Sequence, residues 1–118
     1  MDDHDRYNRQ KLLAPIGDDG QELLRGSTIL IAGCGALGTV TADLLARAGV
    51  GTLVIVDRDV VDYSNLQRQT LFTERDAQNS VPKAEAAKAR LSLINSEVKV
   101  RAFVEEIAPD TIHDLAED

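Results

Sequence analysis

The stretch LIAGCGALG, Leu30–Gly38, places three glycines at G-x-G-x-x-G spacing directly after an apolar run. In this pattern Gly33 permits a tight turn off a strand, Gly35 lets the backbone approach a phosphate, and Gly38 lets the next helix pack close to the sheet. The N-terminus of that helix offers free N–H groups and a partial positive charge to an anion. The stretch therefore predicts a strand, a nucleotide-binding turn and a helix.

Two apolar runs flank this turn and predict parallel strands. TILIAG (residues 28–33) and TLVIVD (residues 52–57) are nearly continuous in β-branched and aliphatic residues, which is typical of strands covered on both faces. Gly49 is expected to end the helix between them. The residues of that helix at helical spacing are Leu37, Val40, Thr41, Leu44, Leu45 and Ala48.

The third predicted strand lies in EVKVRAFV, residues 97–104, where apolar side chains alternate with Lys99, Arg101 and Phe103. Alternation indicates a strand at a sheet edge with one face partly in water. A helix beginning at Pro82 precedes it, and a last helix is expected from Pro109 to the end of the chain. The predicted fold class is α/β: half of a doubly wound, Rossmann-like parallel sheet with strand order 3-2-1. Its first strand is expected to have an unpaired edge and to promote self-association.

The chain length of 118 residues predicts one domain with one core. Residues 1–27 are expected to form an N-terminal helical segment, with short helices in RYNRQKLL and GQELLRG, and residues 28–118 the Rossmann-like half.

Composition argues against several classes of partner. The net charge of −7 speaks against a nucleic-acid partner, which needs clustered cations. The acidic N-terminus does not resemble a signal peptide, and no apolar stretch is long enough to span a membrane. A single cysteine, Cys34, suits a reducing, cytoplasmic location, and no set of metal ligands at suitable spacing is visible, so no metal site is predicted in this chain.

The residues after the second strand bear on which nucleotide binds. Asp57 is placed to accept hydrogen bonds from a ribose, which fits NAD and ATP equally well. A capping box of Ser64 and Gln67 would begin a short helix that carries three polar residues beside the nucleotide, and Lys83 would begin the next helix. A triphosphate carries about four negative charges and usually recruits Lys or Arg, so two separated cations favour ATP. The three polar residues of the short helix are Asn65, Arg68 and Gln69.

Several stretches resemble the ThiF/MoeB/HesA family, bacterial relatives of the ubiquitin-activating enzymes. They are RYNRQ (residues 6–10), GCGALG (33–38), AGVGTLVIVDRDVVDYSNLQRQ (48–69) and PKAEAAK (82–88). The most specific piece is D-x-D-x-V-x-x-S-N-L-Q-R-Q. The resemblance implies an ATP- and Mg²⁺-dependent adenylyltransferase that activates the C-terminal glycine of a ubiquitin-like sulfur-carrier protein in molybdopterin or thiamin biosynthesis.

The resemblance also implies roles for particular residues. Arg9 would reach the γ-phosphate bound by the neighbouring subunit of a homodimer, and Arg68 and Lys83 would act with it on the phosphates. Asp57 would bind the ribose, and Asp59 would orient a lysine or metal. The nucleotide-binding residues are thus expected to be Gly33, Gly35, Ala36, Gly38, Asp57, Asp59, Ser64, Asn65, Gln67, Arg68 and Lys83.

The chain departs from the family pattern at Ala36 and in its length. Ala36 stands where most members carry a glycine, and Cys34 is interpreted as a small residue in a tight turn because no base is placed to activate it. Full-length members continue with a strand that ends in a magnesium-binding aspartate and with C-x-x-C pairs that bind zinc. The chain is therefore expected to be an N-terminal fragment, inactive alone. Alternatives are an NAD- or FAD-binding half-domain of an oxidoreductase, a tRNA-modifying dehydratase of the same superfamily, and a non-catalytic binding module.

Overall fold

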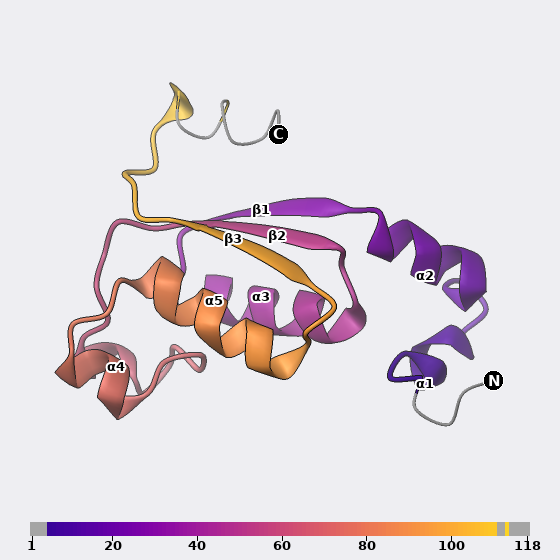
Figure 1. Cartoon of the computed structure of the whole chain (residues 1–118), viewed down its shortest axis with the longest axis horizontal. Coiled ribbons are helices and arrows are strands. Elements are labelled where there is room, and N and C mark those ends of the chain that lie inside the picture. The colour runs from indigo at the N-terminus through magenta and orange to yellow at the C-terminus, as the bar shows by residue number, and fades with distance from the viewer. Residues whose placement is uncertain (1–4, 111–112, 114–118) are drawn as a thin grey trace.

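Three five-residue parallel strands form the centre of the computed structural model, which describes residues 5–110 and 113 (Figure 1). They are β1 (Thr28–Ala32), β2 (Thr52–Val56) and β3 (Lys99–Phe103). β2 pairs with β1 on one side and with β3 on the other, so the predicted order 3-2-1 is confirmed. Because the strands are parallel, their carboxyl ends meet at one edge of the sheet.

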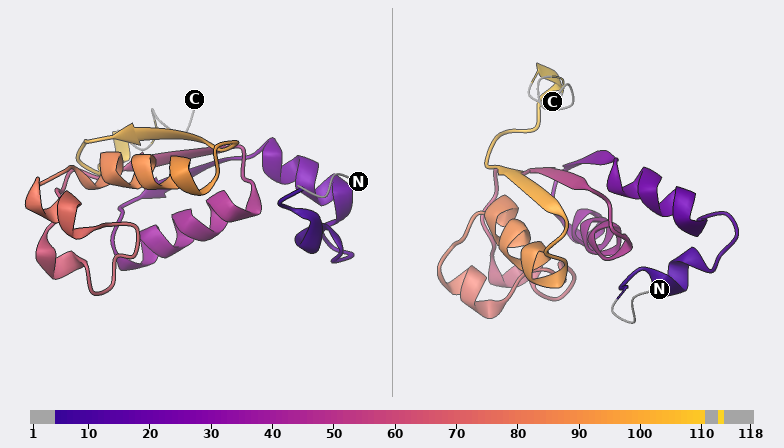
Figure 2. Two further views of the ribbon diagram at one scale, coloured as in Figure 1. Left: turned by 60° about the horizontal axis from the view of Figure 1, so that its bottom comes forward. Right: turned by 45° about the vertical axis from the view of Figure 1, so that its right-hand side comes forward.

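Two long helices, α3 (Ala36–Ala48) and α5 (Lys83–Ile94), cover the same face of this sheet (Figure 2). The main core lies between them and the strands. It is made of side chains at most 7% exposed, among them Ile31, Leu53, Ile55, Ala42, Ala87, Leu91 and Val100. β-Branched and aliphatic strand residues meet alanine-rich helix faces here, and this lets the helices lie close to the sheet.

The helix predicted between the first two strands is confirmed, and Gly49 ends it in the left-handed conformation, with φ of 90°. The stripe that α3 buries differs from the predicted spacing. Leu37 and Leu44 are 80% and 61% exposed, whereas the buried residues of the helix are Thr39, Ala42 and Ala46. Small side chains allow a close approach of α3 to β1 and α5, and the larger leucines project away from that contact.

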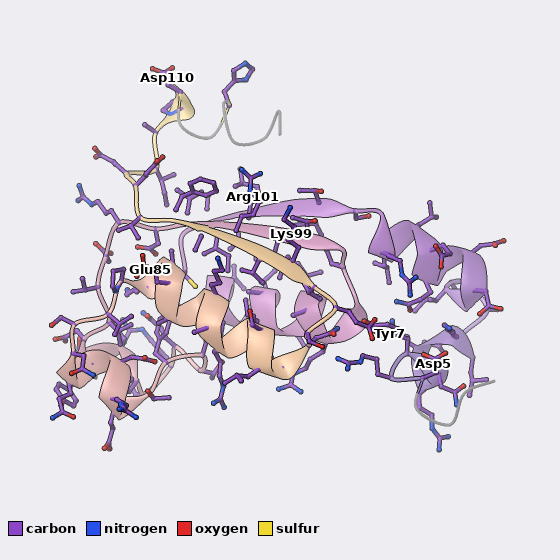
Figure 3. All side chains as sticks on the ribbon, viewed as in Figure 1. Asp5, Tyr7, Glu85, Lys99, Arg101 and Asp110 are labelled. Atoms are coloured by element: carbon purple, nitrogen blue, oxygen red, sulfur yellow. The ribbon has the colours of Figure 1, made fainter. Side chains whose placement is uncertain are left out.

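The expectation that both of the first strands are covered on both faces holds for only one of them. β2 is buried from Leu53 to Val56, but Thr28 and Ala32 at the two ends of β1 are exposed. In β3, Val100 is buried while Lys99 is exposed, as its alternating sequence predicts. Figure 3 shows the Lys99 and Arg101 side chains on the face of the sheet away from α5. There the Arg101 guanidinium lies 5.2 Å from the centre of the Phe103 ring.

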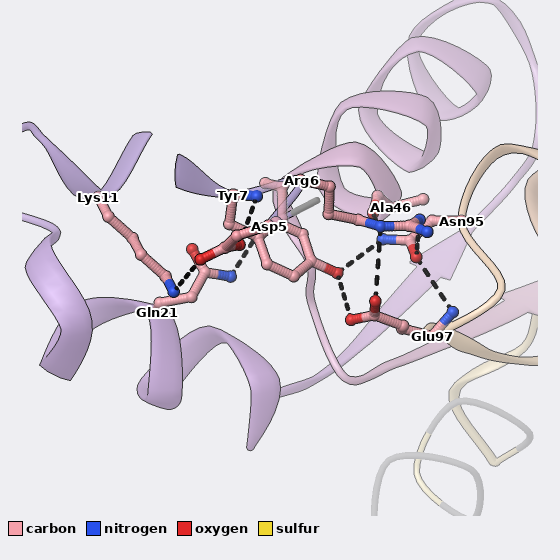
Figure 4. A network of polar contacts seen from close by, with 9 residues as sticks. Asp5, Arg6, Tyr7, Lys11, Gln21, Ala46, Asn95 and Glu97 are labelled. Atoms are coloured by element: carbon pink, nitrogen blue, oxygen red, sulfur yellow. Dashed lines mark hydrogen bonds and ion pairs between the residues drawn. The ribbon is translucent and has the colours of Figure 1, made fainter. Parts of the chain in front are cut away.

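The two predicted N-terminal helices are α1 (Asn8–Lys11) and α2 (Gly17–Arg25). Both lie beside the amino ends of the strands, as Figures 1 and 2 show. Figure 4 shows the polar network that holds this segment to the domain. Its centre is Asn95, which is 1% exposed and donates hydrogen bonds of 2.8 and 2.9 Å to the Ala46 carbonyl and the Tyr7 hydroxyl.

Two short helical segments connect β2 to α5: a 3-10 turn at Tyr63–Asn65 and α4 (Glu74–Gln78). The predicted capping box of Ser64 and Gln67 is wrong. Asp62 and Asn65 form the box instead, because the Asp62 carboxylate accepts from the Ser64 N–H and the Asn65 side chain accepts from the Asp62 N–H. Pro82 is the N-cap of α5 rather than its first helical residue.

The helix predicted from Pro109 onward lies mostly outside the described residues. Among residues 5–110 and 113, no helix combines the length and the apolar character needed to cross a membrane.

Candidate functional site

Most of the site residues predicted from the sequence lie near the carboxyl ends of the strands. The chain turns after β1 at Gly33, whose N–H donates to the Val56 carbonyl at 2.9 Å. Asp57 follows β2 directly, and its N–H donates to the Phe103 carbonyl at 3.1 Å. These two bonds extend the sheet by one residue and fix the glycine loop beside Asp57.

The three glycines of the loop are present for different reasons. Gly33 has φ of +95°, a conformation that side chains rarely adopt, and a Cβ on Gly38 would lie 2.1 Å from the Gly33 carbonyl oxygen. Neither constraint applies to Gly35, because its φ is −93° and a Cβ there would meet, among the described residues beyond its chain neighbours, only the Gln69 Nε2 atom, at 4.0 Å. Internal packing therefore does not require a glycine at position 35, and its missing side chain leaves open space in front of α3.

This open space faces a helix N-terminus that no side chain caps. The first N–H groups of an α-helix have no partner within the helix, so those that follow Gly35 are available to a ligand. They carry the positive end of the helix dipole of a 13-residue helix. Ala36, the first residue of α3, is exposed at this point. The geometry is that of a phosphate-binding turn.

Asp57 is 6% exposed and ties the strand ends together. One carboxylate oxygen accepts from the Cys34 N–H at 2.7 Å, and the other accepts from the Asp59 N–H at 2.8 Å. Each oxygen has a second lone pair for a further donor, such as a ribose hydroxyl. Asp57 also borders a pocket of about 330 Å³ whose other lining residues are Gly33, Arg58, Asp59, Glu106 and Ile107.

Lys83, the first residue of α5, is 8% exposed, and within the described part of the chain no carboxylate lies within 4.0 Å of its ammonium group. Burial raises the pKa of the Cys34 thiol to about 12, and the Asp57 carboxylate adds to that rise while Lys83 opposes it. The pKa of Asp62 is lowered by hydrogen bonds from Ser64 and, more weakly, by Lys83. Lysines are rarely buried unless they are paired, so Lys83 is a candidate anion-binding residue.

The residues of the 3-10 turn mainly hold the turn itself. The Ser64 hydroxyl donates to Asp62 at 2.5 Å, and the buried Asn65 accepts from the Asp62 N–H at 2.8 Å. The Arg68 guanidinium is exposed and donates to the Ser64 carbonyl at 3.0 Å, and Gln67 is also exposed. Ser64 and Asn65 thus have structural roles that the sequence did not reveal, and their nucleotide contacts stay a prediction.

Gln69 follows the 3-10 turn and is absent from the predicted set of nucleotide-binding residues. It is 3% exposed, and its Oε1 atom has no hydrogen-bond partner among the described residues. An unsatisfied buried polar group costs about 1–3 kcal/mol, so such groups are uncommon without a reason. The sequence predicted Arg68 and Gln69 on a short helix, but the 3-10 turn ends at Asn65 and both residues follow it. Only the packing distinguishes the buried Gln69 from the exposed Gln67.

Of the other predicted residues, Arg9 stands apart from this arrangement, whereas Asp59 lines the Asp57 pocket with its side chain exposed. Arg9 is exposed on α1, and Figure 1 places α1 at the opposite end of the sheet from the glycine loop. The Asp59 side chain is 63% exposed and lies 4.0 Å from the Arg58 guanidinium. Residues 5–110 and 113 contain no group of three histidine, cysteine or carboxylate side chains that could hold a metal ion.

Comparison with known proteins adds independent observations. The model of the ThiF family matches residues 7–118. The chain is 50% identical over 113 residues to the sulfur carrier protein ThiS adenylyltransferase of Bacillus subtilis, covering 96% of this chain and 34% of that protein. It is 46% identical over 98 residues to the molybdopterin-synthase adenylyltransferase of Haemophilus influenzae, covering 83% of this chain and 40% of that protein.

Among solved structures, E. coli MccB with ATP superimposes with a TM-score of 0.81 at 30% identity, covering 96% of this chain and 35% of that one. The chain thus spans less than half the length of each of these relatives. The parallel sheet, the glycine loop before α3 and the family match over residues 7–118 agree. The chain therefore belongs to the ThiF family.

Proposed function

We propose that this chain is the ATP-binding part of an adenylyltransferase that activates the C-terminal glycine of a ubiquitin-like sulfur-carrier protein. Relatives at 50% and 46% identity carry the names of adenylyltransferases for ThiS and for molybdopterin synthase, and this similarity supports the reaction class. The carrier protein is the proposed partner.

The single observation that carries the proposal is the buried Lys83, which forms no ion pair with any of the described residues. It acts together with the open space at Gly35, in front of the uncapped α3 N-terminus. Backbone amides and a helix dipole suffice for the diphosphate of NAD, whereas an added buried cation suits the higher charge of a triphosphate. In the proposal Asp57 binds the ribose, and Lys83, Asn65 and Arg68 bind the phosphates.

The proposed reaction transfers adenylate to a carboxylate. An oxygen of the terminal glycine attacks the α-phosphorus, a new phosphorus–oxygen bond forms, and the bond to the oxygen that bridges to the β-phosphate breaks, so pyrophosphate leaves. Negative charge accumulates on the phosphate oxygens in the transition state. Fixed donors and cations stabilise that charge without any proton transfer. Magnesium is the proposed companion of ATP.

We propose that Arg9 acts on the nucleotide bound by a second copy of the chain. Its helix lies at the far end of the sheet from its own glycine loop (Figure 1), so Arg9 is not positioned to serve the site of its own subunit. We therefore propose a homodimer in which Arg9 contacts the phosphates bound by the other subunit. In the full translation product of the gene, mixing an Arg9→Ala variant with a Lys83→Met variant should restore part of the adenylation activity that each variant lacks alone, because one mixed site then contains both cations.

Calorimetric titration of the chain with ATP and with NAD tests the nucleotide assignment. We expect ATP to bind more tightly than NAD, and equal or tighter binding of NAD would refute the proposal. Replacing Lys83 by methionine should weaken ATP binding by roughly 1.5–3 kcal/mol, the usual worth of a hydrogen bond to a charged group. Lys88→Met, an exposed position on the same helix, is the matched control.

The adenylation step is tested in the full translation product of the gene. There the exchange of labelled pyrophosphate into ATP should depend on a carrier protein that ends in glycine. Pyrophosphate exchange that proceeds without the carrier protein, or that depends on a tRNA instead, would exclude the proposed partner.

A further inference from the structure

The Gln69 carboxamide is a buried group of the candidate site whose hydrogen-bonding capacity is unused. The residue is 3% exposed, its Oε1 lacks a partner, and no hydrogen bond of its side chain is found among the described residues. Its backbone, in contrast, is fixed on both sides. The Gln69 N–H donates to the Asn65 carbonyl at 2.9 Å, and its carbonyl accepts from the Phe72 N–H at 3.2 Å.

The position of this amide connects it to the glycine loop. The Gln69 Nε2 atom lies 4.0 Å from the place that a Cβ on Gly35 would occupy, and no other atom of the described residues, the chain neighbours of Gly35 aside, comes as close. Gly35 is the loop glycine that neither backbone conformation nor packing requires. The unpartnered amide therefore borders the open space in front of the α3 N-terminus.

The chemistry around that space indicates which ligand the Gln69 Nε2 donor would meet there. The helix N-terminus contributes free N–H groups, and the buried Lys83 contributes a positive charge. Both select an anion, and an amide nitrogen is a hydrogen-bond donor that binds phosphate oxygens without adding charge. A neutral donor buried before the ligand arrives is also pre-organised, since its side chain loses little further freedom on binding.

We propose that Gln69 is a phosphate-binding residue, whose Nε2 donates to the nucleotide phosphate that lies against Gly35. This inference rests on the proposed function, because it takes the anion to be the phosphate chain of ATP. It assigns the residue a direct contact with the nucleotide in addition to its place in the turn after β2.

The test replaces Gln69 by methionine, which has nearly the same shape and no donor. Calorimetry on the chain then compares ATP, AMP and adenosine as ligands. We expect Gln69→Met to lower the affinity for ATP and AMP by about 10-fold or more, the effect of losing a hydrogen bond to a charged acceptor, and to leave adenosine binding unchanged. Without ligand, the melting temperature should stay the same or rise, because the substitution removes an unsatisfied buried oxygen.

Gln78→Met is the matched control, since Gln78 is exposed at the end of α4. It should change neither affinity nor stability. Unaltered ATP affinity in Gln69→Met would overturn the inference. An equal loss for ATP and adenosine would do so as well, because it would indicate a general structural role.

A second variant keeps the inference testable if the Gln69→Met chain does not fold. Gln69→Asn keeps a neutral amide but shortens the side chain, so its donor no longer reaches the phosphate, and ATP binding should fall while adenosine binding persists. Failure of the wild-type chain to bind ATP would instead count against the proposed function. The two proposals are thus separated by the wild-type titration alone.

Discussion

Asp57 combines a structural and a proposed functional role in one side chain. Its two oxygens accept from the Cys34 and Asp59 N–H groups, so removing the carboxylate leaves two backbone donors without an acceptor. We expect Asp57→Ala to weaken ATP binding by roughly 1.5–3 kcal/mol and to lower the free energy of unfolding by about 1–3 kcal/mol. Calorimetry and urea unfolding measure the two effects separately. Asp59→Ala, at an exposed side chain, is the stability control, and an Asp57 variant as stable as that control would contradict the structural role.

Cys34 illustrates how burial decides the chemistry of a residue. Burial raises the pKa of its thiol to about 12, from an ordinary value of 9.0. The thiol of the unfolded chain therefore ionises at a lower pH than the native thiol. This contribution to stability is complete below pH 9 and is lost as the pH rises toward 12. We expect an alkylating reagent at pH 8 to modify the unfolded chain but not the folded one, and rapid native-state labelling would show that the thiol is accessible.

Within the glycine loop and α3, two glycines should respond to the same substitution in opposite ways. An alanine at Gly38 would place its Cβ 2.1 Å from the Gly33 carbonyl oxygen, so the helix must shift. We expect Gly38→Ala to lower the free energy of unfolding by about 1–3 kcal/mol, as overpacking usually does. Gly35→Ala should leave stability nearly unchanged and weaken ATP binding, because its methyl group enters the proposed phosphate site. Urea unfolding and calorimetry of both variants distinguish them, and a Gly35→Ala chain that binds ATP normally would show that the space is not used.

At the scale of the whole molecule, one edge of β1 has backbone N–H and C=O groups that no neighbouring strand among the described residues pairs with. Within the described residues β1 pairs only with β2. A groove of about 430 Å³ follows its other side, lined in part by Ile29, Leu30, Ile31 and Leu37. Apolar strand edges without lysine or proline favour pairing with another chain. We therefore expect the chain to self-associate at micromolar concentration, as light scattering would measure.

A charge at the edge should oppose this association. Leu30→Lys is expected to shift the chain toward the monomer, whereas Leu93→Lys, at a position 83% exposed on α5, should not. A wild-type chain that scatters as a monomer would show that this edge is protected in solution.

The sequence alone determined the order of strands and helices, because hydrophobic periodicity and glycine spacing are local signals. As predicted, the strands β1 and β2, in TILIAG and TLVIVD, pair in parallel, and the helix between them ends at Gly49. The position of Asp57 beside the glycine loop also followed, since parallel strands bring their carboxyl ends together.

Only the tertiary structure decided which side chains of these elements are buried and what they contact. Helical spacing did not reveal that α3 buries Thr39, Ala42 and Ala46 and exposes Leu37, because the buried stripe depends on how closely α5 and β1 approach. Nor did it distinguish the buried, unpartnered Gln69 from the exposed Gln67 two residues earlier. Burial depends on contacts between segments distant in sequence, and a local pattern of residue types does not contain that information.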